Sequence, residues 1–215
     1  MSAFFSFELE PPPWLYRLMV RLGLMNRLYR QLGADICQNA PRRGLVIDVG
    51  AGPGHLLTLV GQERPDLRLL SLDHVWQMLR PISMASQSPP FPAMWRLVGD
   101  AAALPLRDGC ADLAVATFSF HTWEHPALGL REMRRIVKPG KQSYIYEMNR
   151  EASPAQLQAI ARQEGLPYLL VAAGYRLLSW NHALGRRDFA AMFSQAGIRS
   201  WELQPFHEIL WRAVF

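Results

Sequence analysis

Residues 45–55 decide the fold, and they read Leu45-Val46-Ile47-Asp48-Val49-Gly50-Ala51-Gly52-Pro53-Gly54-His55. A β-branched apolar run enters three alternating glycines and is followed by apolar residues at helical spacing, which predicts a buried parallel strand, a tight turn and a helix. Glycine tolerates a positive φ and lets a ligand approach the backbone. The start of the helix offers unpaired N–H groups and the positive end of its dipole. Together with the carboxylate of Asp48, this turn suits a zwitterionic or ribose-bearing ligand better than a bare polyphosphate.

A second acidic residue stands at the end of the next predicted strand. Residues 67–73 form an apolar run that ends in Asp73, and the interval from the glycines accommodates one crossover helix over 56–63. In dinucleotide-binding folds, an acid about 20 residues beyond the glycines receives ribose hydroxyls. A surface aspartate without a ligand is the alternative, but two strand-end carboxylates at this interval favour a shared binding site.

Strands and helices alternate along the rest of the chain. We expect strands over 95–98, 111–118 and 142–147, and helices over 75–86, 126–137, 154–164 and 187–196. The last stretches, 198–203 and 209–215, predict a hairpin-like pair of strands joined around Pro205. This order predicts an α/β fold: a doubly wound, mostly parallel seven-stranded sheet with an antiparallel last strand, plus a helical cap.

The chain is expected to have four parts. They are an N-terminal helical cap segment (1–43), a cofactor-binding Rossmann-like core (44–150), a cap insertion (151–186) and the C-terminal part of the core sheet (187–215). In the first part, apolar residues recur at helical spacing from Trp14 to Leu32, with arginines on the other faces. This pattern predicts a helix that packs on the core. A basic helix that lies on a membrane or on a partner protein is the alternative.

Composition limits the class of protein. The 215 residues are 50% hydrophobic and 19% charged, as in globular domains, and no apolar run approaches the roughly 18 residues of a membrane span. The N-terminus has no basic cluster before an apolar region, so no signal peptide is expected. Cys37 and Cys110 show neither disulfide nor metal-ligand spacing, which predicts a reducing, cytoplasmic setting. The net charge is +5, but the arginines are scattered, and this disfavours a nucleic-acid partner.

With these residues in view, the chain resembles the S-adenosylmethionine-dependent methyltransferases of the Rossmann-like class I. It looks closest to the group of quinone-biosynthesis C-methyltransferases and other small-molecule methyltransferases. The likeness covers residues 44–150. The motifs that support it are 48–54, Asp73 with Met78-Leu79, Gly99-Asp100-Ala101 with Leu104-Pro105 and Asp112, 118–121 and 131–140. A lone glycine motif is weak, whereas this ordered set is specific. One departure is Lys141 after Gly140, where the family commonly has a second glycine, and we expect only a local adjustment of that turn.

The resemblance implies S-adenosylmethionine as the cofactor and no metal. The glycine turn would hold the methionine moiety, Asp73 the ribose, and Asp100 with Ala101 the adenine, while Phe118 would face the cofactor from the end of the fourth strand. The full set of implied cofactor-binding residues is Asp48, Gly50, Gly52, Gly54, Asp73, His74, Asp100, Ala101 and Phe118.

Two histidines are the catalytic candidates. His121 and His125 follow the fourth strand and Glu147 ends the fifth, where a sheet of this type presents its ligand crevice. We expect His121 to act as a base or to orient the acceptor, because imidazole titrates near neutral pH, and His125 is the second candidate. Glu147 is expected to stabilise the loop or the cap rather than to transfer protons. His55 is expected to be a polar residue at the helix start rather than a ligand.

Aromatic residues outside the sheet pattern favour a small, apolar or aromatic acceptor. They are Tyr168, Tyr175 and Trp180, together with Trp14 and Tyr16. Two other functions stay open. An NAD(P)-dependent oxidoreductase is disfavoured because His55 stands where its fingerprint needs a glycine. A catalytically silent binding or assembly module of the same fold would also keep an intact cofactor motif. The proline-rich loop 88–92 has no assigned role.

Overall fold

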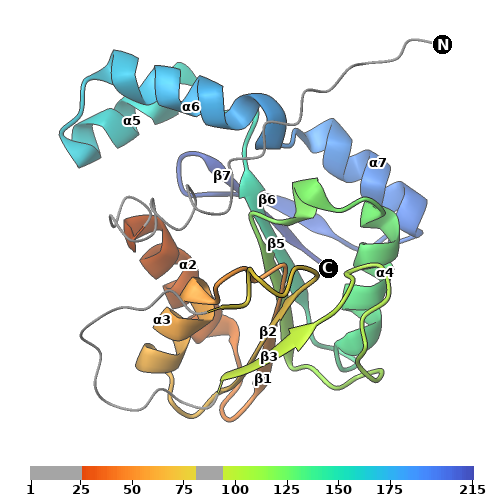
Figure 1. The fold of residues 1–215 in the computed structure, drawn as a ribbon. Coiled ribbons are helices and arrows are strands. Elements are labelled where there is room, and N and C mark those ends of the chain that lie inside the picture. The colour runs from red at the N-terminus through yellow and green to blue at the C-terminus, as the bar shows by residue number, and fades with distance from the viewer. Residues whose placement is uncertain (1–25, 81–93) are drawn as a thin grey trace.

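A single seven-stranded sheet forms the centre of the computed structural model, which describes residues 26–80 and 94–215 (Figure 1). The strands are β1 (Leu45–Val49), β2 (Arg68–Asp73), β3 (Met94–Val98), β4 (Leu113–Thr117), β5 (Ser143–Met148), β6 (Glu202–Phe206) and β7 (Leu210–Val214). Their order across the sheet is β3-β2-β1-β4-β5-β7-β6. The first five strands pair in parallel, β7 runs antiparallel to β5, and β6 runs antiparallel to β7. The predicted fold class is therefore confirmed.

Helices cover both faces of the sheet (Figure 1). On one face α2 (Asn26–Asn39) packs with α3 (His55–Glu63), and on the other α4 (Pro126–Ile136) packs with α7 (Arg186–Ala196). A further pair, α5 (Pro154–Glu164) and α6 (Tyr168–His182), lies beyond the end of β5. Within the described residues, no helix has both the length and the apolar character that crossing a membrane requires.

Successive side chains of a strand point to opposite faces of the sheet, so the strands contribute to two hydrophobic cores, one on each face. The core under α2 and α3 contains Val46, Leu69, Val115 and Tyr146 from the sheet and Leu32, Ile36, Leu57 and Val60 from the helices. The core under α4 and α7 contains Ile47, Ala114 and Ile145 from the sheet and Leu130, Met133, Phe189 and Phe193 from the helices. These cores hold the strand ends in fixed positions relative to one another, as a binding site requires.

A partly buried ionic cluster joins α2 to the sheet. Nη1 of Arg212 in β7 donates to both carboxylate oxygens of Asp35 in α2, at 2.7 and 2.8 Å. The hydroxyl of Tyr146 in β5 donates to Oδ2 of the same carboxylate at 2.5 Å. Nη2 of Arg212 donates to Oε1 of Gln204 at 2.7 Å. The helix is therefore joined to both β5 and β7 by charged hydrogen bonds.

The helix expected over 75–86 is wrong for residues 75–80, which form turns. The backbone N–H of Met78 donates to the Val75 carbonyl at 2.9 Å and that of Leu79 to the Trp76 carbonyl at 3.2 Å. The N–H of Val75 is itself held by the Asp73 carboxylate at 2.9 Å. These bonds span three residues, so they close single turns rather than an α-helix. The remainder of the expected helix and the loop 88–92 lie outside the described residues.

Two further boundaries differ from the sequence expectation. Pro205 lies inside β6 rather than in the connection, and the strand begins at Glu202 rather than at residue 198. Proline is tolerated there because β6 is an edge strand, on which a missing N–H leaves no ladder partner unsatisfied. Helix α2 continues to Asn39, beyond the expected end at Leu32. Residues 14–25 of the expected N-terminal helix lie outside the described residues.

Candidate active site

The glycine turn between β1 and α3 joins the ends of three strands. Gly50 has a φ of +78°, and a Cβ at this position would lie 2.4 Å from the Cβ of Ser119, so only glycine fits. The hydroxyl of Ser119, which follows β4, donates to the Val49 carbonyl at 2.9 Å. The N–H groups of Gly50 and Ala51 donate to the Leu72 carbonyl of β2 at 2.7 and 2.9 Å. The ends of β1, β2 and β4 therefore meet at one turn.

Asp73 at the end of β2 stabilises this turn. Its Oδ2 accepts the N–H of Gly52 and its Oδ1 accepts the N–H of Val75, both at 2.9 Å. A carboxylate has about four acceptor positions, so hydrogen-bonding capacity remains for a ligand. The residue is 6% exposed. The neighbouring His74 is exposed, and its Nδ1 lies 3.6 Å from Oδ1 of Asp73.

Asp48 is the unusual acid of the site. It is 1% exposed, and no described residue provides a hydrogen-bond partner for its Oδ1. Burial, followed by the nearby charge of Asp73, raises the pKa of Asp48 from 3.8 to about 8. A buried polar atom without a partner is costly. A bound group that carries a hydrogen-bond donor or a positive charge would relieve this cost, and a methionine ammonium has both properties.

Asp100 and Ala101 follow β3, next to the end of β2. The N–H of Gly99 donates to the Asp73 carbonyl at 3.1 Å, which holds the two strand ends together. Asp100 is exposed, and its Oδ1 accepts the N–H of Ala102 at 2.8 Å. The two residues thus directly follow a backbone contact to Asp73, at the same edge of the sheet as the glycine turn.

Phe118 follows the last residue of β4 and has a φ of +53°, a conformation that costs about 1–2 kcal/mol for a residue other than glycine. Its N–H donates to the Tyr146 carbonyl at 3.0 Å. Its ring meets the ring of Tyr29 from α2 edge to face, with a centroid distance of 6.3 Å. The strained backbone therefore turns the chain away from the strand just where the other site residues gather.

His121 and Glu147 form a side-chain pair at the ends of β4 and β5. His121 lies in a one-turn helix, η1 (Phe120–Thr122), and 13% of its side chain is exposed. Its Nδ1 lies 2.9 Å from Oε2 of Glu147, and its backbone N–H donates to Oε1 at 3.2 Å. Glu147 is completely buried. The expected loop-stabilising role of Glu147 thus coincides with a direct contact to the first catalytic candidate.

His125 stands apart from this pair. It precedes the first residue of α4, where its carbonyl accepts the N–H groups of Leu128 and Gly129 at 3.0 and 3.1 Å. Its side chain is 58% exposed, and its Nε2 lies 4.0 Å from Oε1 of Glu124. The structure thus places His125 at a helix start, whereas His121 is held against a buried carboxylate.

His55 begins α3, as expected. Its ring meets the Tyr29 ring edge to face at 5.0 Å, and burial lowers the pKa of its imidazole below the usual 6.5. Its Nε2 is buried, and the described residues offer this atom no hydrogen-bond partner. A neutral ring that packs on α2 is consistent with the structural role expected from the sequence.

Trp123 is a site residue that the sequence reasoning missed. A Cβ at Gly129 in α4 would lie 2.3 Å from ring atom Cε3 of Trp123, and a Cβ at Gly50 would lie 3.7 Å from its Nε1. The indole therefore reaches from α4 to the glycine turn. A sequence signal did exist, because a glycine inside a helix weakens it and commonly marks a close contact.

Asp112 and Gly140, which also carry the family resemblance, belong to the opposite edge of the sheet. Asp112 accepts the N–H of Leu45 at 2.9 Å through Oδ2 and pairs with Nζ of Lys138 at 2.7 Å through Oδ1. Gly140 has a φ of +76°, and the N–H of Lys141 donates to the Lys138 carbonyl at 3.0 Å. The turn thus forms with Gly140 as its glycine and with Lys141 at the following position.

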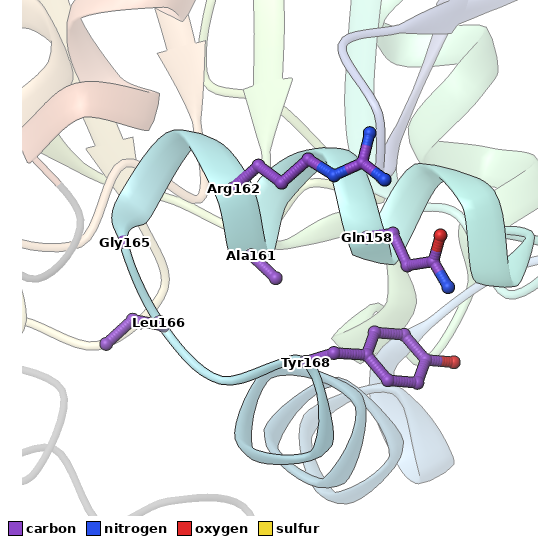
Figure 2. Close-up of a pocket in the computed structure, with 6 residues that line it drawn as sticks. All are labelled: Gln158, Ala161, Arg162, Gly165, Leu166 and Tyr168. Atoms are coloured by element: carbon purple, nitrogen blue, oxygen red, sulfur yellow. The ribbon is translucent and has the colours of Figure 1, made fainter.

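An open pocket lies on the α5–α6 pair, away from the glycine turn. Figure 2 shows its six lining residues, Gln158, Ala161, Arg162, Gly165, Leu166 and Tyr168. None of these residues belongs to the strand-end site. Within residues 26–80 and 94–215, no three His, Cys, Asp or Glu side chains gather in a way that could hold a metal ion.

Comparison with known proteins finds sequence similarity to methyltransferases. Residues 47–145 match the family model of the methyltransferase domain. A malonyl-[acyl-carrier protein] O-methyltransferase of Methylococcus capsulatus is 34% identical over 118 residues, which are 55% of this chain and 42% of that protein. A ubiquinone/menaquinone biosynthesis C-methyltransferase of Caulobacter is 30% identical over 155 residues, which are 67% of this chain and 60% of that protein. The chain thus spans less than two thirds of the length of these curated relatives.

Solved structures show the same fold. A Methanococcus maripaludis protein described as an S-adenosyl-L-methionine-dependent methyltransferase superposes with a TM-score of 0.69 at 21% identity, over 94% of this chain and 90% of that one. A S-adenosylmethionine-dependent methyltransferase of Aquifex aeolicus superposes with a TM-score of 0.58 at 17% identity, over 81% and 82% of the two chains. At these identities the likeness concerns the fold alone.

Proposed function

We propose that this chain is a class I methyltransferase that takes S-adenosylmethionine as its cofactor and moves a methyl group to a small, apolar or aromatic acceptor. One observation carries the proposal. The glycine turn, the hydrogen-bonded carboxylate of Asp73 and the unpartnered carboxyl of Asp48 converge at one edge of the sheet. Backbone donors and two acids suit a ligand that bears an amino acid and a ribose.

Each part of the site has a proposed role toward the cofactor. Backbone groups of Gly50, Gly52 and Gly54 hold the methionine moiety, and Asp48 receives its ammonium group. Asp73 accepts the ribose hydroxyls with the acceptor positions that its two backbone contacts leave. The residues around the adenine and the edge of the site are His74, Asp100, Ala101 and Phe118. When bound, the cofactor supplies a methyl group activated by a sulfonium, so the protein mainly positions the acceptor in line with it.

His121 is the proposed base or orienting residue on the acceptor side. It lies two residues after Ser119, whose side chain touches the glycine turn, and Glu147 fixes its ring. His125, whose side chain is 58% exposed at the start of α4, is retained as the second candidate. If His121 acts on the acceptor and does not hold the cofactor, His121→Ala lowers turnover and leaves the affinity for the cofactor unchanged.

The acceptor class rests on two supports. The O-methyltransferase and the quinone-pathway C-methyltransferase among the relatives act on small or carrier-bound molecules, according to their names. In addition, aromatic side chains of the cap insertion, Tyr168 and Tyr175, are half-buried, and the Tyr175 hydroxyl donates to the Asn149 carbonyl next to β5. The cap is thus anchored close to the strand that carries Glu147. A reducing, cytoplasmic setting is part of the proposal, because Cys37 and Cys110 are free thiols.

Transfer of tritiated methyl groups tests the proposal. The purified chain is incubated with labelled S-adenosylmethionine and with phenols, naphthols and reduced naphthoquinones, and in parallel with bulk tRNA and with unfolded protein. Label is expected only in small-molecule products. Label only in RNA or protein contradicts the acceptor class. Tight binding of S-adenosylhomocysteine without transfer to any acceptor supports the silent binding module instead.

A further inference from the structure

The contact between His121 and Glu147 carries a further inference, which rests on the proposed function. We propose that Glu147 is a positioning residue that keeps the proton of the His121 imidazole on Nδ1, so that Nε2 takes the proton of an acceptor with an acidic hydroxyl, such as a phenol. The pair lies at the ends of β4 and β5, and its two members stand 26 positions apart in the chain.

Both oxygens of Glu147 serve the same residue. Oε1 accepts the backbone N–H of His121 at 3.2 Å, and Oε2 lies 2.9 Å from its Nδ1. An ionised carboxylate can only accept hydrogen bonds, so Nδ1 must carry the hydrogen in this contact. In a neutral imidazole the other nitrogen, Nε2, is then the acceptor. The carboxylate thereby selects the tautomer.

A purely structural role explains only half of this arrangement. One acceptor for the backbone N–H would suffice to hold η1, and a neutral side chain could supply it. Burying a carboxylate completely is costly unless its charge is paired with an opposite charge. An imidazole that gains a proton during the reaction provides that opposite charge, because the buried carboxylate then stabilises the imidazolium.

The position of the ring fits a role on the acceptor side. The loop that carries His121 is tied to β1 through Ser119, whose hydroxyl donates to the Val49 carbonyl. The side chain of His121 is 13% exposed, whereas Glu147 has no contact with solvent. The imidazole thus contacts the buried carboxylate and keeps a small solvent-exposed surface, and Ser119, two residues earlier, contacts the end of β1 at the glycine turn.

The proton balance defines the class of acceptor. The hydroxyl proton of the acceptor passes to Nε2 of His121. The electron pair that it leaves on the acceptor oxygen forms the bond to the methyl carbon, and the pair of the broken sulfur–carbon bond stays on sulfur, which becomes a neutral thioether. The imidazolium later returns its proton to solvent. An acceptor without an ionisable proton, such as a thioether or a tertiary amine, would need no such base.

Nitrogen-15 NMR of the histidine rings tests the tautomer directly. In the wild type, long-range proton–nitrogen correlations are expected to show His121 protonated on Nδ1. In Glu147→Gln, the amide oxygen must face the backbone N–H, which is always a donor, and the amide NH2 then faces Nδ1. The imidazole is expected to adopt the other tautomer, with its proton on Nε2. Glu202→Gln, at an exposed position of β6, is the matched control and leaves the tautomer unchanged.

The variant also separates this inference from the proposed function. Glu147→Gln is expected to bind S-adenosylhomocysteine with unchanged affinity in calorimetry, while its kcat in the phenol assay falls at least about tenfold. Wild-type His121 protonated on Nε2 overturns the inference without any variant, as does full activity of Glu147→Gln. Absence of S-adenosylhomocysteine binding in the wild type overturns the proposed function instead, since the tautomer does not depend on the cofactor.

Discussion

Two aspartates on the α2–α3 side of the molecule, Asp35 and Asp48, have opposite surroundings. Asp35 is 13% exposed in its side chain and receives hydrogen bonds from Arg212 and Tyr146. Asp48 is 1% exposed, and the described residues leave its Oδ1 without a partner. The first acid is paired with a cation, while burial raises the pKa of the second to about 8. The difference teaches that one carboxyl stabilises the fold and the other is kept for a ligand.

This contrast follows from where each residue lies. Asp35 joins α2 to β5 and β7, where hydrogen bonds from Tyr146 and Arg212 add specificity to the packing of the helix. Asp48 stands at the glycine turn, beside Asp73, where charge and hydrogen-bonding capacity are left unused. Sites commonly retain such local costs because the bound ligand removes them. Substitutions can remove the unpaired acid or the cation of the paired acid separately.

The largest effect is expected from the titration of Asp48. Its pKa is about 8 in the folded chain and near 4 when unfolded, so between these values the folded state holds a proton that the unfolded state has released. The free energy of unfolding must therefore fall as pH rises, by roughly 4 kcal/mol from pH 5 to pH 8. Urea unfolding at several pH values measures this slope.

Asp48→Asn is expected to remove that slope and to be more stable than the wild type at pH 8. Asp108→Asn, whose wild-type carboxylate is 80% exposed, is the matched control and keeps the wild-type slope. Identical pH profiles for the wild type and Asp48→Asn would show that Asp48 is not held neutral.

Removal of the cation that pairs with Asp35 should destabilise the fold. Arg212→Leu leaves the Asp35 carboxylate buried without its cation, and a loss of about 3 kcal/mol in unfolding free energy is expected. Arg199→Leu, at an exposed position, should stay within about 0.5 kcal/mol of the wild type. If both variants lose equally little stability in urea unfolding, the cluster does not fasten α2.

A smaller loss is expected at the glycine turn. In Gly50→Ala the new methyl group meets Ser119 at 2.4 Å and the residue keeps a φ of +78°, so stability should fall by about 2 kcal/mol and cofactor affinity with it. Gly174→Ala in α6 is the control, because a Cβ there meets nothing within 4 Å and alanine favours helix. A fully stable Gly50→Ala with normal affinity would mean that the turn can relax.

Much of the fold could be read from the sequence because its signals are local. The alternation of apolar strands with helices predicts the sheet, and the glycines at 50, 52 and 54 mark a turn that requires positive φ. The spacing from that turn to Asp73 predicts that two acids share one edge of the sheet, and the structure brings them together. Pro205 misled the prediction of a turn because an edge strand tolerates proline without local compensation.

The parts that could not be predicted depend on contacts between distant residues. Nothing local links His121 to Glu147, since their contact follows from the pairing of β4 with β5 and from the short η1 turn. The role of Asp112 was equally hidden, because its partners Leu45 and Lys138 are distant along the chain and meet it only at the edge opposite the glycine turn. The turns over 75–80 arise from the Asp73 carboxylate, which captures the N–H of Val75.

The most direct test of the central claim is calorimetric binding of S-adenosylhomocysteine. The account predicts saturable one-to-one binding by the wild type and no heat with NAD. Asp73→Ala should weaken binding at least about 100-fold, equivalent to about 2.7 kcal/mol, while Asp66→Ala at a partly exposed site away from the glycine turn binds as the wild type does. Circular dichroism confirms that both variants are folded. Absence of binding by the wild type, or equal affinity in Asp73→Ala, would contradict the claim that the strand ends around the glycine turn hold this cofactor.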